Sequence, residues 1–110
     1  MGKDLLGELE HQVLLAVLRL GPEAYSSSIV VELEERTGRD VAPAAVYIAL
    51  RRLEDKGMAA SEMRPADDDD GGRTRRYFHA TRSGRALLRE SRRRLMSLWD
   101  GLDAALEEGA

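Results

Sequence analysis

Apolar residues recur at helical spacing in two stretches of the first 40 residues. The first stretch, 5–20, predicts a helix that ends at Gly21-Pro22. The second, 26–36, predicts a shorter helix, because the run of three serines at its start supplies N-cap hydroxyls and Gly38 suits its end. The apolar stripe of the first helix contains Leu6, Leu9, Val13, Val17 and Leu20, widened by Leu14 and Leu18. That of the second contains Tyr25, Ile29 and Leu33.

The stretch from Ala42 to Gly57 has two different helical faces. Pro43 suits the first helical turn, and Gly57 suits the residue after the last one. The inner face carries Val46, Leu50 and Leu53, which predict a core stripe. The outer face carries Ala44, Tyr47, Ile48 and Arg51. A small, aromatic and cationic outer face is typical of a helix that reads the major groove of DNA, although the pattern also fits an ordinary surface helix.

Two short runs after this helix predict a β-hairpin. Residues 58–64 and 75–80 alternate as strands do, and Tyr77 and Phe78 should lie on opposite faces. Three helices followed by a hairpin predict a mainly α (α+β) fold, the winged helix-turn-helix. The descending arm of the wing carries Arg73, Arg75 and Arg76, which we expect to contact phosphates or a minor groove. A solvated hairpin arm is the alternative.

The C-terminal segment predicts one long dimerisation helix. Thr81 suits its N-cap, and a helix from there to Leu106 would be about 40 Å long. Its apolar seam contains Leu88, Leu95, Leu98, Trp99, Leu102 and Leu106. Such a seam needs a partner, either the first helix of the same chain or a second copy, and we expect both. The predicted organisation is a DNA-binding domain, 1–80, and a dimerisation helix, 81–110.

Charge is unevenly distributed along the chain. The 110 residues carry a formal net charge of −3, which argues weakly against a nucleic-acid partner. Residues 1–40 hold four basic and eight acidic residues, whereas residues 72–94 hold nine arginines and one glutamate. A polyanion responds to the local field, so the basic segment favours binding to phosphates. A salt-bridged surface would explain the arginines at 89–94 equally well.

Other chemistry is poorly supported. The chain has no cysteine and no motif of a nucleotide-binding loop, a hydrolase or a zinc protease, so we expect no enzyme, cofactor or metal. Asp67 to Asp70 suggest a solvated loop tip that phosphates would repel. His11 and His79 lack partners at catalytic or ligand spacing. No apolar run is long enough to span a membrane and no signal peptide is evident, which favours a cytoplasmic location.

Five segments of the chain resemble the PadR family of transcriptional regulators, specifically its short subfamily. The matching segments are Leu5 to Gly21, Ala24-Tyr25, Val46 to Gly57, Gly71 to Leu88, and Trp99 to Leu102. The resemblance implies a winged helix-turn-helix, a C-terminal dimerisation helix and repression through a palindromic operator. Some short members resemble drug sensors that hold a ligand at the dimer centre.

The chain departs from the family pattern at the start of its second and third helices. Ser26 replaces a usual glycine, and Ala42 and Ala44 replace a serine and a glycine. Losing the serine removes a cap worth about 1 kcal/mol. The acidic run Asp67 to Asp70 is also unusual. These departures affect the expected operator sequence rather than the fold.

The sequence therefore predicts a homodimeric DNA-binding regulator, a repressor with double-stranded operator DNA as its partner. Two alternatives stay open. Trp99 and its symmetry mate could stack a small planar aromatic effector, which would make the protein a ligand-released repressor. The acidic loop and the net charge also allow a protein-interaction module that has lost DNA binding.

Overall fold

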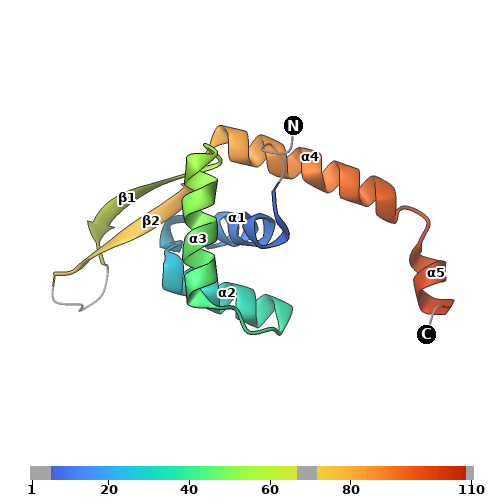
Figure 1. Ribbon diagram of the computed structural model, residues 1–110, viewed down its shortest axis with the longest axis horizontal. Coiled ribbons are helices and arrows are strands. Elements are labelled where there is room, and N and C mark those ends of the chain that lie inside the picture. Colours follow the sequence, from blue (N-terminus) through green and yellow to red (C-terminus); the bar gives the residue numbers. More distant parts are fainter. Residues whose placement is uncertain (1–5, 67–71, 109–110) are drawn as a thin grey trace.

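The computed structural model describes residues 6–66 and 72–108 (Figure 1). The predicted acidic tip, Asp67 to Asp70, lies outside the described residues. In chain order the elements are α1 (Glu8–Leu20), a 3-10 turn η2 (Gly21–Glu23), α2 (Ser26–Thr37), α3 (Pro43–Asp55), β1 (Ala59–Pro65), β2 (Thr74–Ala80), α4 (Arg82–Trp99) and α5 (Asp103–Glu108).

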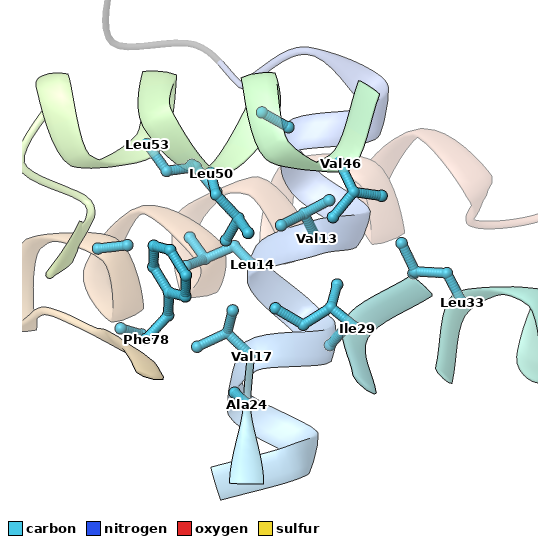
Figure 2. Packing of buried hydrophobic residues seen from close by; sticks show 14 of the residues in the cluster. Val13, Leu14, Val17, Ala24, Ile29, Leu33, Val46, Leu50, Leu53 and Phe78 are labelled. Atoms are coloured by element: carbon cyan, nitrogen blue, oxygen red, sulfur yellow. The ribbon is translucent and has the colours of Figure 1, made fainter. Parts of the chain in front are cut away.

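Helix α1 lies at the centre of the core. Both α2 and α3 pack against it, and β2 and α4 contact it as well. Figure 2 shows Val13, Leu14 and Val17 of α1 between side chains of α2, α3 and β2. The α3 residues that reach this core are Val46, Ala49, Leu50 and Leu53. The predicted inner stripe of α3 is therefore confirmed.

The ends of α1 and α2 follow from local chemistry. α1 begins at Glu8, later than the predicted residue 5, after Gly7 as its extended N-cap, whose N–H donates to Glu10 Oε1. α2 begins after Tyr25, and its cap is Ser28, whose Oγ accepts the Tyr25 N–H at 2.9 Å. Gly38 ends α2 in the left-handed conformation at φ 71°, which glycine adopts at little cost.

The hairpin β1–β2 is antiparallel and is attached at its base to the segment before α2. The register runs from Ala59 opposite Ala80 to Pro65 opposite Thr74. The Phe78 N–H donates to the Ala24 carbonyl at 2.8 Å, and Tyr25 forms an isolated bridge with Tyr77. Tyr77 and Phe78 are both buried, because Phe78 packs in the core on one face and Tyr77 lies against Tyr25 and Arg64 on the other.

The start of α4 is held tightly against the residue that precedes β1. Thr81 Oγ1 accepts the Gly84 N–H, as the predicted N-cap should, and also donates to the Gly57 carbonyl at 2.7 Å. A Cβ placed on Gly84 would lie 2.1 Å from the Met58 carbonyl oxygen. Only glycine fits this contact between helix and backbone.

The prediction of one continuous helix to Leu106 is wrong. α4 ends at Trp99, and its 18 residues span about 27 Å. Gly101 has φ 82°, a conformation incompatible with a continuing α-helix, and α5 starts two residues later. Figure 1 shows α5 turned away from the axis of α4 at the far end of the molecule.

Candidate nucleic-acid interface

The outer face of α3 is exposed along its whole length. Tyr47 and Ile48 are 49% and 50% exposed, and Ala44 and Arg51 are also exposed. Figure 1 shows α3 at the front of the view, with α1 behind it and the hairpin at its side. The four residues predicted to read DNA thus lie together on one side of a helix whose other side is fixed in the core.

Tyr47 and Arg51 form a pair on this face. Arg51 Nη1 donates to the Tyr47 hydroxyl at 3.0 Å, and the guanidinium carbon lies 5.9 Å from the ring centroid. The hydrogen bond to Tyr47 raises the pKa of Arg51 above its usual value, so this side chain stays cationic. One hydroxyl and one guanidinium are therefore presented together, and both can bind a phosphate or the edge of a base.

The N-terminal end of α3 lacks a side-chain cap. Ala42 is the N-cap residue and offers no side-chain acceptor, whereas Pro43 at the first position has no N–H and needs no acceptor. The N–H groups of Ala45 and Val46 donate to the Ala42 carbonyl at 3.0 and 3.2 Å, whereas that of Ala44 has no hydrogen-bond acceptor among the described residues. A phosphate oxygen is one acceptor that suits such a group.

The wing arginines do not form one group. Arg76 lies on the face of the hairpin toward α3, because its Nη1 donates to Ser61 Oγ at 3.0 Å. The Ser61 hydroxyl in turn donates to Glu54 Oε2 of α3 at 2.6 Å. Arg76 is exposed and continues the surface of α3 onto the wing.

Arg75 lies on the opposite face of the hairpin. Its guanidinium carbon is 4.2 Å from the centroid of the Tyr25 ring. The Arg64 guanidinium lies 3.7 Å from the Tyr77 ring centroid, and the two tyrosine rings meet edge to face at 5.6 Å. Arg64 also donates to the Pro22 carbonyl. This cluster fastens the wing to the body, so Arg75 has a structural contact that Arg76 does not share. Arg73 is exposed next to the start of β2.

Met63 is a surface residue that the sequence analysis did not single out. It lies opposite Arg76 in the strand register and is 52% exposed. Cross-strand partners project to the same face, so Met63 adds exposed apolar surface beside Arg76. The alternation of β1 would have identified it once the face toward α3 was known.

An ion pair fixes the C-terminal end of α3 on α1. Lys56 Nζ lies 2.6 Å from Oε1 of Glu10, a residue only 8% exposed. Burial raises the pKa of Glu10, but the hydrogen bonds from Lys56 and Gly7 and the charges of Lys56 and Arg52 outweigh it, and the pKa lies below its usual value. Glu10 is therefore ionised at neutral pH and holds the C-terminal end of α3 on α1.

The predicted dimerisation residues divide into two sets. Leu88 belongs to the core of its own chain, so its contact is already made. The others are exposed: Leu95, Leu98, Trp99, Leu102 and Leu106. A groove of about 590 Å³ lies between α1 and α4, with Leu15 and Leu18 on one side and Leu95 and Trp99 on the other. His11, expected to be structural, also lines this groove, while His79 is exposed on the wing.

In the described ranges 6–66 and 72–108, no cluster of three or more potential metal ligands occurs. No helix there is both long and apolar enough to cross a bilayer.

The helix pair α2–α3, joined by a short turn and followed by a two-stranded hairpin, defines the winged helix-turn-helix class. Solved structures share this architecture. A PadR family transcription regulator from hypervirulent Clostridium difficile R20291 has a TM-score of 0.74 at 19% identity and covers 91% of this chain and 99% of its own. A PadR family transcriptional regulator from Eggerthella lenta DSM 2243 has a TM-score of 0.63 at 32% identity and covers 88% and 85%.

The chain belongs to the transcriptional regulator PadR-like family, whose model matches residues 14–90. It is also 42% identical over 76 residues to the transcriptional regulator Rv3488 of Mycobacterium tuberculosis, an alignment that covers 69% of this chain. The alignment covers 66% of that protein, just under two thirds of its length. Family and relatives are transcriptional regulators rather than enzymes.

Proposed function

We propose that this protein is a cytoplasmic, homodimeric repressor that binds a palindromic operator. The observation that carries the proposal is the pair of opposed faces on α3. Its inner residues are buried in the core, while Ala44, Tyr47, Ile48 and Arg51 are exposed on a fixed helix. A rigid helix with a hydroxyl, a cation and small apolar groups on its free side has the chemistry of base-edge and phosphate recognition.

Two-fold symmetry is supported by the exposed apolar residues of α4 and α5. Leu98 is 72% exposed and Trp99 is 50% exposed, and both lie on a helix that extends beyond the core. A second copy would cover these side chains and place two α3 helices on one side of the dimer. Half-sites would then be separated by about one helical turn, roughly 10 bp.

The wing contributes a contact to the DNA backbone. Arg76 and Arg73 are exposed, and Arg76 lies on the side of the hairpin that faces α3. Both are suited to phosphates, which give affinity without sequence preference. Arg75 contributes by holding the wing through Tyr25.

Selection of bound sites from a random DNA pool tests the proposal. We expect a palindromic consensus that binds one dimer, with affinity that falls as salt rises. Binding without any salt dependence, or no binding at low salt, would favour a protein-interaction module instead. A consensus with a single half-site per bound protein would contradict the proposed dimer but not the proposed role of α3 in reading DNA.

Release by a small planar apolar effector is a second candidate function. The observation that favours it is the groove between α1 and α4, which holds the half-exposed Trp99 at one end. Titration of tryptophan fluorescence with a panel of planar aromatic compounds tests it. We expect quenching together with weaker operator binding. A flat fluorescence response across the panel would leave Trp99 as a packing residue.

A further inference from the structure

Helix α5 is amphipathic and every one of its residues is exposed. Leu106, with Leu102 one turn earlier and just before the helix, forms its apolar side. Its acidic residues are Asp103, Glu107 and Glu108, none of which forms an ion pair with any described residue. A short isolated helix with unpaired charges and an exposed leucine side is marginal in water, so it needs a surface to pack against.

The groove between α1 and α4 has the complementary character. Its apolar floor includes Leu15, Leu18 and Leu88. Arg85, Arg89 and Arg92 line the same groove at helical spacing along α4, and we call them the arginine row. No member of this row is ion-paired within the parts of the chain that the structure describes. The groove thus offers an apolar surface for the leucine side of α5 and positive charges for its acidic residues.

We propose that α5 of a second copy docks against the arginine row. Its leucine side would cover the apolar floor of the groove, and its acidic residues would pair with the three arginines. The proposal rests on the proposed homodimer and names the contacts that orient it. In a two-fold dimer the contact is reciprocal, so the α5 helix of each copy would lie on the arginine row of the other.

The same chain's α5 is a poorer occupant of this site. α5 is joined to α4 by only three residues, Asp100 to Leu102. A reversal of direction uses these residues, so a folded-back α5 would lie over the end of α4 that carries Leu95 and Trp99. Arg89 lies ten residues, about 15 Å, before Trp99.

Two complementary charge reversals test which copy supplies α5. The first variant carries Asp103→Lys, Glu107→Lys and Glu108→Lys, and the second carries Arg85→Glu, Arg89→Glu and Arg92→Glu. We expect each variant alone to raise the dimer dissociation constant about tenfold or more at low salt, measured by sedimentation equilibrium. The difference from wild type should shrink at about 1 M salt, where the Debye length is about 3 Å.

An equimolar mixture of the two variants is the decisive measurement. In a mixed dimer each reversed α5 meets a reversed arginine row and each native α5 meets a native row, so α5 from the other copy restores wild-type affinity. A fold-back of α5 onto its own chain leaves both repulsions in the mixture. Restoration only when one chain carries all six changes would therefore overturn the proposal, as would unchanged dimers of both variants.

Controls separate this contact from folding and from the dimer itself. Glu35→Lys, on the exposed face of α2, should leave the dissociation constant unchanged. The neutral variant Asp103→Asn, Glu107→Gln and Glu108→Gln should weaken the dimer less than the reversal and keep the test usable if the lysines unfold α5. A wild-type chain that is monomeric at all concentrations would overturn the proposed homodimer, whereas a dimer indifferent to every charge change would overturn only the α5 contact.

Discussion

The body of the molecule, residues 8–88, buries most of its large apolar side chains, whereas its C-terminal arm, residues 89–108, exposes them. Within the body, α1 collects the inner faces of α2, α3 and β2, and charges such as Glu10 and Lys56 are paired. In the arm no described residue after Leu88 is buried, and several large apolar side chains face solvent. The body is stable through contacts within one chain, whereas the arm is completed only by another surface. Five predictions bear on this difference.

Removing a core leucine should have the largest effect. Leu50→Ala deletes a fully buried side chain of α3 and should cost about 2–5 kcal/mol of unfolding free energy. Thermal denaturation measures it, at any protein concentration. Leu98→Ala is the matched control in the arm: it should change the midpoint only at concentrations where the protein is dimeric. If both variants lowered the stability of the monomer equally, the arm would be packed as tightly as the body.

A methyl group at the junction of body and arm should be nearly as damaging. Gly84→Ala places Cβ against the Met58 carbonyl, and overpacking of this kind costs about 1–3 kcal/mol. Denaturant unfolding should show a lower midpoint with an unchanged slope. Ala86→Gly, on the exposed side of the same helix, should cost only the difference in intrinsic helix propensity, about 1 kcal/mol. A stability for Gly84→Ala equal to wild type would mean that α4 can shift without cost.

Arg51→Ala tests the exposed face of α3. It should reduce affinity for the selected operator by about 1–3 kcal/mol and relax preference at one position in each half-site. Quantitative gel shifts on operator and mutated operators measure both. Tyr47→Phe removes the hydroxyl that Arg51 contacts and should have a smaller effect in the same direction. Unchanged affinity and unchanged preference for Arg51→Ala would remove it from the reading face.

Glu10→Gln tests the pairing of charges in the body. Because the folded pKa of Glu10 lies below its unfolded value, the ionised carboxylate stabilises the fold above the unfolded pKa, and this contribution is lost as pH falls through the folded pKa. We expect wild type to exceed the variant by about 1 kcal/mol at pH 7. The difference should vanish below the folded pKa. A difference that persists at the lowest pH would point to packing rather than charge.

The smallest effects should come from the wing. Arg76→Ala should weaken binding to all DNA alike and reduce the salt slope by about 1, as expected for one phosphate contact. Arg75→Ala should change the salt slope less, since Arg75 packs on Tyr25 on the far side of the hairpin. Affinity for any DNA duplex, measured at several salt concentrations, gives both slopes, because phosphate contacts do not depend on sequence. If both variants reduced the salt slope by the same amount relative to wild type, both arginines would contact DNA.

Periodicity predicted the body well because each helix there buries one face of regular spacing. The inner residues of α3 follow directly from that rule. The arm was mispredicted because the leucines at 88, 95 and 102 keep heptad spacing across Gly101, so the seam continues although the helix does not. The Asp-Gly pair at 100–101 was the local signal for the break.

The division of the wing arginines illustrates another limit. Strand alternation places Arg75 and Arg76 on opposite faces from sequence alone. Which of these faces looks toward α3 depends on the contact of β2 with the segment before α2, a pairing between residues more than 50 positions apart. Met63 was missed for the same reason. The local pattern shows which residues share a strand face, but only the tertiary pairing determines which face points toward α3.

The Phe78 N–H donates to the Ala24 carbonyl, and Ser61 donates to Glu54, so the wing is bonded both to the segment before α2 and to α3. We therefore expect the wing and α3 to keep the same angle to each other if the arm is rearranged. In the proposed dimer, a change at the arm alters only the distance and rotation between the two copies of this wing and helix. Any signal received there would be transmitted as a mismatch in half-site spacing, with the base preference of each half unaltered.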